Sequence, residues 1–137
     1  MMYKAMDEIV NILKENKLAY KTWEKDKDSR ILVNVNDRIL NYQIQFILTD
    51  DSNDVAIRAL QVKFPKEKQK AMILFANQCN SKYRALKFVV RCEDNTMEIE
   101  YDCTHNCNPG SEAFEILVHI LKTGRAIDTD LMKQVWA

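Results

Sequence analysis

The chain holds few residues that interrupt regular structure: two glycines and two prolines among 137 residues. This scarcity leaves no room for a long flexible linker or a low-complexity segment. It also excludes the glycine-rich loops that cradle phosphates in nucleotide-binding proteins. The G-x-S-x-G and H-E-x-x-H patterns of hydrolases are missing as well. We therefore expect no catalytic residues, no cofactor and no enzyme activity.

An excess of one charge is also missing, because 20 basic side chains balance 20 acidic ones. Nucleic-acid binders usually show a basic excess, since phosphate contacts supply much of their affinity. The nearest basic cluster, Lys-Glu-Lys-Gln-Lys at 66–70, is typical of the solvated first turn of a helix. No stretch reaches the roughly 18 apolar residues that span a bilayer, and residues 1–8 lack the apolar centre of a signal peptide. We expect a cytoplasmic protein with no nucleic-acid or membrane partner.

What is present is the composition of one globular domain, which we place at residues 1–137. Its hydrophobic fraction of 47% and charged fraction of 29% are ordinary for a folded protein. A chain of this length buries about two thirds of the surface that it exposes when unfolded. The four cysteines are then expected to be reduced thiols rather than a disulfide framework.

Hydrophobic periodicity predicts the first half of the fold. Apolar residues at helical spacing indicate a first helix that stops near Asn16-Lys17; they are Met2, Met6, Ile9, Val10 and Leu13. Alternation with a period of two predicts strands at 18–23, 31–35, 42–48 and 55–64. A solvated turn is expected over 24–29 and another over 49–54, with a bulge near 56–59 where the alternation slips.

A second helix is predicted from Pro65 to Tyr83. Its apolar stripe consists of Met72, Phe75, Ala76, Cys79 and Tyr83. Ile73 and Leu74 fall outside that stripe, so this helix needs cover on two sides. Either the first or last helix provides the second cover, or Ile73 and Leu74 form a dimer or partner interface.

A hairpin is predicted over 85–103, with Asp94-Asn95 as a two-residue turn. That turn would pair Val90 with Ile99, and it would place Arg91 opposite Glu98. It would also pair Cys92 with Met97, Phe88 with Tyr101, Leu86 with Cys103 and Lys87 with Asp102.

The last helix is expected to begin with Ser111 as its N-cap. Its apolar stripe is Phe114, Leu117, Val118 and Leu121, continued by Ile127, Leu131, Met132 and Val135. Gly124 either bends this helix or ends it, in which case Asp128 or Thr129 caps a further helix. The resulting order, α-ββ(β)β-α-ββ-α, is an antiparallel sheet of meander plus hairpin packed with three helices, an α+β fold.

Cys103, His105 and Cys107 form the one cluster with the chemistry of a metal or redox site. Structural zinc usually needs four ligands in matching pairs. The predicted hairpin places Cys92 about 20 Å from Cys103, too far to share an ion. Cys79 belongs to an apolar stripe, where a thiol acts as a small hydrophobe. The cluster is therefore more simply a strand end followed by a polar loop.

Other candidate catalytic groups also have simpler structural explanations. Glu98, Glu100 and Asp102 share one strand face, as paired carboxylates in a hydrolase do, but Lys87 and Arg91 are their expected ion-pair partners. His119 lies between Val118 and Ile120 in the last helix, where we expect a partly buried residue rather than a base.

The pattern as a whole resembles the YbjN-like family, described as a putative bacterial sensory transduction regulator, which shares the fold of type III secretion chaperones. The resemblance rests on the element order, on Phe64-Pro65 before the second helix, and on Asn77 and Asn80 in the run Phe-Ala-Asn-Gln-Cys-Asn at 75–80. This run looks like the family's I-N-x-x-N helix ending, although Phe75 and Ala76 replace the usual aliphatic residue. The resemblance implies a non-enzymatic module, often dimeric, that binds another polypeptide.

Two functional hypotheses follow from different classes. The first is a homodimeric regulator or chaperone-like module that binds an unidentified client through a strand edge or a helix groove. The alternative is a small metal- or thiol-dependent protein that uses Cys103, His105 and Cys107. Bound zinc, lost when Cys103 and Cys107 are replaced by alanine, would support only the second.

Overall fold

The structure is a computed structural model that describes residues 3–49, 54–103 and 109–136. Its elements follow the predicted order: α1 (Lys4–Glu15), β1 (Tyr20–Lys25), β2 (Asp28–Asn36), β3 (Asn41–Leu48), β4 (Val55–Lys63), the 3-10 turn η1 (Lys66–Lys68), α2 (Gln69–Lys82), β5 (Lys87–Arg91), β6 (Thr96–Cys103) and α3 (Pro109–Trp136). The described strands form one sheet in the order β1-β2-β3-β4-β6-β5, with every pair antiparallel. The α+β fold class is therefore confirmed.

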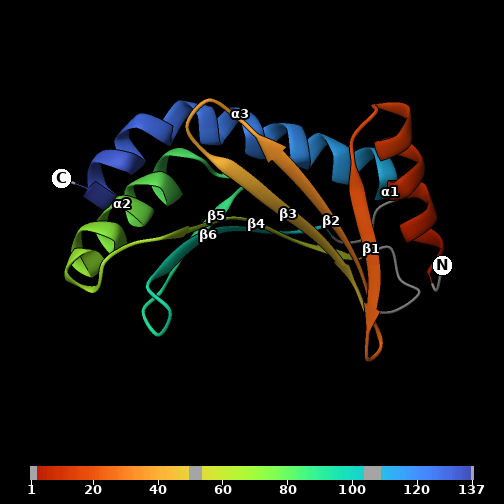
Figure 1. Cartoon of the computed structure of the whole chain (residues 1–137), viewed down its shortest axis with the longest axis horizontal. Helices are drawn as coiled ribbons and strands as arrows, with labels where there is room; N and C mark the ends of the chain where they lie inside the picture. Colours follow the sequence, from red (N-terminus) through yellow and green to blue (C-terminus); the bar gives the residue numbers. More distant parts are fainter. Residues whose placement is uncertain (1–2, 50–53, 104–108, 137) are drawn as a thin grey trace.

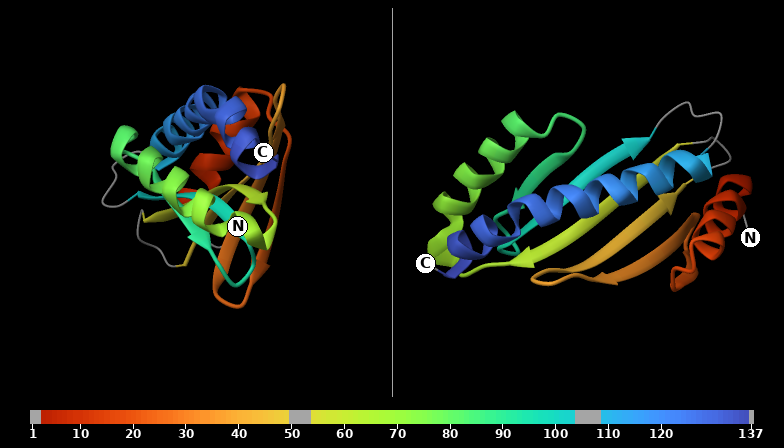
Figure 2. Two further views of the ribbon diagram at one scale, coloured as in Figure 1. Left: turned by 90° about the vertical axis from the view of Figure 1, so that its left-hand side faces the viewer. Right: turned by 90° about the horizontal axis from the view of Figure 1, so that it is seen from above.

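The molecule has two layers, with the helices on one side of the arched sheet (Figures 1 and 2). Alternation explains this arrangement, because every second residue of a strand points to the same face. On β3, the predicted residues Tyr42, Ile44, Phe46 and Leu48 are all buried under the helices. Gln43 and Gln45 between them remain on the other face, which no described helix covers.

The turn between β1 and β2 is much shorter than the predicted 24–29. The ladder continues to the pair Lys25–Asp28, so that only Asp26 and Lys27 form the turn. Asp26 takes a φ of 57°, the left-handed conformation that tight two-residue hairpins require. Glu24, Lys25 and Asp28 therefore lie in paired strands, although their charge predicted a solvated turn.

The irregularity in β4 lies later than predicted. Ala59 pairs with Ile99 and Val62 pairs with Met97, so β4 contributes one extra residue between these rungs. Val55, Ile57 and Ala59 face the core, and after the extra residue the core side passes to Val62 and Phe64. The extra residue shifts the alternation by one position, so that apolar residues face the core on both sides of the bulge. The bulge therefore lies between 59 and 62 rather than at 56–59.

The hairpin of β5 and β6 exists, but the predicted register is wrong by two residues. Val90 pairs with Met97 rather than Ile99, and Phe88 pairs with Ile99 rather than Tyr101. Residues 92–95 connect the strands, and only Asn95 takes a positive φ, of 55°. The amide of Gln69 on α2 donates to the carbonyl of Cys92 (3.1 Å) and to Oδ1 of Asn95 (2.6 Å), which fixes this longer connection. A shift of two residues keeps Phe88, Met97 and Ile99 on the core face.

The predicted stripe of α1 is buried within the described residues, and so is that of α2 except for Tyr83, which is half-buried at the C-cap. α2 begins at Gln69, after η1, rather than at Pro65. Met2 and residues 50–53 of the predicted 49–54 turn lie outside the part of the chain that the structure describes.

Of the two forms left open for the last helix, the structure has the single helix, and it differs from the prediction in its N-cap and its apolar stripe. α3 runs without a break from Pro109 to Trp136, so Gly124 does not end it and Ser111 lies inside it rather than at its N-cap. Asp128 and Thr129 likewise lie within α3 and cap no further helix. Its buried apolar residues are Ala113, Leu117, Ile120, Ile127, Leu131 and Val135, while Phe114, Val118, Leu121 and Met132 are half-buried.

Candidate functional site

The outward face of α2 carries two large apolar side chains that no described part of the chain covers. Ile73 is 40% exposed and Leu74 is 60% exposed. The opposite face of the helix is buried through Met72, Phe75, Ala76 and Cys79. Because the core already takes that face, Ile73 and Leu74 are surplus to the packing of α2. We call Lys70, Ile73, Leu74, Asn77 and Ser81, which lie on this outward side at helical spacing, the α2 face.

Polar contacts fix α2 to the hairpin at both ends. At the start of the helix, Gln69 bonds the β5–β6 connection as described above. Near its end, the Asn80 side chain accepts from the amide of Phe88 (2.7 Å) and donates to the carbonyl of Phe88 (3.0 Å). Asn80 therefore satisfies the outer backbone groups of β5 at this rung, as a neighbouring strand would. Asn77, the other asparagine of the predicted motif, has an exposed side chain.

The residues that flank the α2 face in sequence are mostly basic. Lys66 and Lys70 are exposed before Ile73, and Lys82 and Arg84 are exposed after Ser81. α2 itself contains no aspartate or glutamate. The cluster at 66–70, which the sequence pattern assigns to a solvated turn, thus lies directly beside exposed aliphatic side chains.

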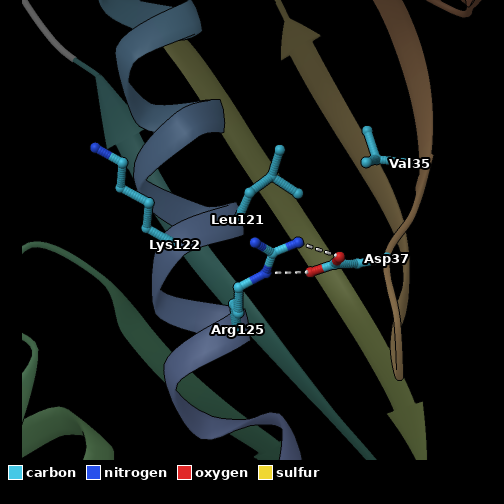
Figure 3. Close-up of a pocket in the computed structure, with 5 residues that line it drawn as sticks. All are labelled: Val35, Asp37, Leu121, Lys122 and Arg125. Carbon is cyan, nitrogen blue, oxygen red and sulfur yellow. Dashed lines mark hydrogen bonds and ion pairs between the residues drawn. The ribbon is translucent and has the colours of Figure 1, made fainter.

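A hollow of about 270 Å³ lies between α3 and the end of β2, lined by Val35, Asp37, Leu121, Lys122 and Arg125. In Figure 3, Arg125 reaches across it to Asp37, while Lys122 extends away. Arg125 donates through Nη2 to Oδ1 of Asp37 (2.6 Å) and through Nε to Oδ2 (3.2 Å). These hydrogen bonds hold the pKa of Asp37 below its usual value.

A second ion pair joins the same two parts of the chain, but here the arginine lies after β2 and the aspartate lies on α3. Arg38 donates to Oδ2 of Asp128 (3.0 Å) and to Oδ1 (3.3 Å), and Thr129 also donates to Oδ1 (3.2 Å). Asp128 is only 2% exposed, and the bonds from Arg38 lower its pKa despite this burial. The four charges cancel, so the arrangement ties the β2–β3 loop to α3 rather than creating a charged binding site.

Tyr42 lies beneath this tie. Its hydroxyl is buried and finds no hydrogen-bond partner among the described residues. Burial, together with the nearby Asp37 and Asp128 carboxylates, raises the pKa of Tyr42 to about 12. Tyr42 packs between the sheet and α3, where its ring approaches Gly124.

The uncovered face of the sheet holds the acidic residues that the sequence pattern singled out. Glu98 is buried and accepts from Arg91 (2.6 Å), and Asp102 accepts from Arg58 (2.9 Å). Glu100 lies between the two arginines, 3.5 Å from Arg58 and 3.1 Å from Arg91. The prediction that basic side chains neutralise these acids is confirmed for Arg91, whereas Lys87 lies opposite Glu100 and Arg58 was missed. Glu98, Arg58 and Arg91 line a polar hollow of about 300 Å³ with Arg30, Gln43, Gln45, Ile47 and Gln61.

The thiols give no metal site in the described chain. Cys79 is buried, which raises the pKa of its thiol to about 11, and Cys92 is exposed. Within residues 3–49, 54–103 and 109–136, no three His, Cys, Asp or Glu side chains are placed to hold an ion. His105 and Cys107 lie outside these residues, as does the side chain of Cys103, so the proposed cluster is not described.

His119 is half-buried on α3, as predicted, beside a shallow hollow formed with Phe114, Glu115, Val118 and Lys122. None of the residues that line this hollow with His119 is a serine, threonine or cysteine that it could activate.

The sequence pattern located Ile73 and Leu74 correctly as apolar residues outside the core stripe. It missed the pairs between Asp37 and Arg125 and between Arg38 and Asp128, whose members are 88 and 90 residues apart in the chain. A signal was available for one of them, because Asp128 interrupts the apolar stripe between Ile127 and Leu131. A charged residue in a buried stripe needs a partner.

Comparison with known proteins adds to this description. A protein-family model described as "Putative bacterial sensory transduction regulator" matches residues 5–117, which is most of the chain and includes all of α2. No curated protein matches the sequence. In the part of the chain that the structure describes, no helix has both the length and the apolar character needed to cross a bilayer. The extent of the family match shows that the chain belongs to the YbjN family.

Proposed function

We propose that this protein is a non-enzymatic interaction module of the cytoplasm, a regulator or chaperone-like protein that binds another polypeptide through the α2 face. The observation that carries the proposal is the exposure of Ile73 and Leu74 on a helix whose other side is fully packed. Complete burial of one aliphatic side chain stabilises by about 1.5–3 kcal/mol. Because both side chains are already partly covered, a partner would gain roughly 2 kcal/mol from the pair.

The α2 face suits a partner better than the edge of the sheet at β5. Addition of a strand requires free backbone groups along an edge. At β5, Asn80 already bonds both the amide and the carbonyl of Phe88. A helix face instead presents side chains, and α2 is held at both ends, so little flexibility would be lost on binding.

A homodimer stays a prediction, as do the single domain over 1–137 and the likeness to type III secretion chaperones. The exposed Lys66 and Lys70 precede Ile73 and Leu74, so two copies of the α2 face would bring like charges together. A dimer is therefore expected to use another surface, which sedimentation of the Ile73→Ser/Leu74→Ser variant would check.

Affinity capture from the native host tests the proposal. The unaltered chain, the Ile73→Ser/Leu74→Ser variant and the Ile39→Ser variant are immobilised at equal density, and bound proteins are quantified. Ile39 is a matched control, because it is an aliphatic residue with 44% exposure that lies on the β2–β3 loop, outside the α2 face. We expect one or more proteins to be retained by the unaltered chain and by Ile39→Ser but lost with the double variant. Equal retention by all three would refute binding at the α2 face.

A further inference from the structure

We propose that the polypeptide bound at the α2 face is acidic, with aliphatic side chains that meet Ile73 and Leu74 and carboxylates that meet the surrounding lysines. This inference rests on the proposed function, and it adds the chemistry of the partner.

The charge of the whole chain is divided unevenly along the sequence. Residues 63–87 contain seven basic side chains and one acidic side chain, Glu67, which gives a net charge of +6. The complete chain has no net charge, so the remaining residues carry an excess of six negative charges. Six of the seven basic residues are exposed: Lys63, Lys66, Lys70, Lys82, Arg84 and Lys87. A neutral total therefore conceals a basic stretch of sequence around α2; the nearby acids are Glu93 and Asp94, in the loop that Gln69 holds, and Asp130, beside Lys82.

The basic and apolar side chains share the same side of the helix. Lys70 lies three residues before Ile73 and four before Leu74, which places it beside both on the helix surface. Asn77 and Ser81 continue the α2 face with uncharged polar groups. Ile73 and Leu74 are therefore the two apolar residues of this face. A ligand that covers the two aliphatic side chains would come within reach of Lys70.

Lys82 lies in the last turn of α2, where a cation stabilises the helix, but the lysines at the start of α2 are not explained by helix stability. The N-terminal end of a helix carries partial positive charge, so acidic residues stabilise it and lysines destabilise it. α1 and α3 follow this rule, with Asp7 and Glu112 in their first turns. α2 has no acidic residue in its first turn and follows directly on η1, whose residues Lys66, Glu67 and Lys68 carry a net charge of +1. The positive charge adds to the helix dipole instead of opposing it.

The chemistry of the α2 face favours a polypeptide over other anionic partners. Single-stranded nucleic acids stack their bases on aromatic side chains, whereas Ile73 and Leu74 are aliphatic. A helix that lies in a membrane surface inserts a broad apolar face, and the broad apolar face of α2 is buried against the sheet. In a second copy of this chain, residues 63–87 would carry the same net charge of +6, so the two copies would repel each other at this face. Complementary charge and two apolar anchors describe an acidic amphipathic segment.

Site-specific crosslinking in the native host tests this inference. A photoreactive phenylalanine derivative replaces Asn77, which is exposed on the α2 face. The same derivative at Asn41, exposed at the start of β3, is the control. After irradiation, crosslinked polypeptides are digested and the attached segment is identified by mass spectrometry. Crosslinking is repeated with Lys66→Glu/Lys70→Glu and with Lys4→Glu/Lys21→Glu, which reverses two exposed lysines outside 63–87.

We expect an adduct from position 77 whose attached segment is net negative and contains aliphatic residues. Reversal of Lys66 and Lys70 should reduce its yield roughly tenfold, while the Lys4 and Lys21 variant should leave it within about twofold. A neutral or basic segment, a second copy of this chain, a nucleic acid or a lipid attached at position 77 would overturn the acidic partner. No adduct above that of position 41 would instead contradict the proposed function, so the two failures are distinct.

Discussion

At the scale of single residues, Gly124 and Tyr42 determine how α3 lies on the sheet. A Cβ atom added to Gly124 would overlap the hydroxyl oxygen of Tyr42 and lie 2.7 Å from two of its ring carbons. Glycine inside a helix is destabilising by about 0.5–1 kcal/mol relative to alanine. The close approach of α3 to Tyr42 explains why glycine is present here in spite of that penalty.

Replacement of Gly124 by alanine should therefore lower the free energy of unfolding, although alanine is the better helix former. Overpacking of this kind destabilises by about 1–3 kcal/mol, and urea denaturation measures the change. Adding Tyr42→Phe removes the nearest atom, so the double variant should recover part of the loss. A Gly124→Ala protein as stable as the unaltered chain would contradict the described packing.

At the scale of elements, two ion pairs tie the β2–β3 loop to α3. In Asp37 and Asp128, hydrogen bonds from arginine lower the pKa below the ordinary value of 3.8. A carboxyl group with a lowered pKa in the folded state stabilises the protein above its unfolded pKa. That contribution is lost as the pH falls toward the lowered value.

The variant Asp37→Asn/Asp128→Asn should be less stable than the unaltered chain at neutral pH, and this difference should shrink below about pH 4. Guanidinium would screen the charges, so urea unfolding at several pH values is the suitable measurement. A difference in stability that is independent of pH would show that the two ion pairs do not form.

Asn80 and Asn77 give a matched pair of substitutions within one predicted motif. Asn80→Ala removes both hydrogen bonds to Phe88, and loss of such bonds typically destabilises by about 1–2 kcal/mol. Asn77→Ala, at an exposed position, should change the unfolding free energy by less than about 0.5 kcal/mol. Equal effects in thermal or urea unfolding would contradict the role given to Asn80.

The elements that depend on local pattern were predictable from the sequence, and those that depend on distant contacts were not. The stripes of α1 and α2 and the alternation in β3 follow directly from hydrophobic period. The register of β5 against β6 depends on Gln69, a residue of another element that holds the connecting loop. The local pattern also gave no reason for a glycine at position 124, because that reason is the close approach of the Tyr42 ring on β3.

At the scale of the whole molecule, the helices cover one face of the sheet, and the surface divides into unlike regions. The uncovered sheet face is polar, with its acids neutralised by Arg58 and Arg91. The region around α2 is basic and contains exposed aliphatic side chains. The helical spacing of the sequence was enough to show that Ile73 and Leu74 lie outside the core stripe of α2. Whether another helix covers them was not, because this depends on the paths of α1 and α3.

The most direct test of the central claim is the affinity of a captured host protein for three forms of this chain, measured by calorimetry. With Ile73→Ser/Leu74→Ser, the loss of about 2 kcal/mol corresponds to roughly 30-fold weaker binding. Ile39→Ser should leave the dissociation constant within about twofold, and both variants should unfold at a urea concentration close to that of the unaltered chain, because all three side chains are exposed. Unchanged affinity in the folded double variant would contradict the claim that the α2 face is the binding surface.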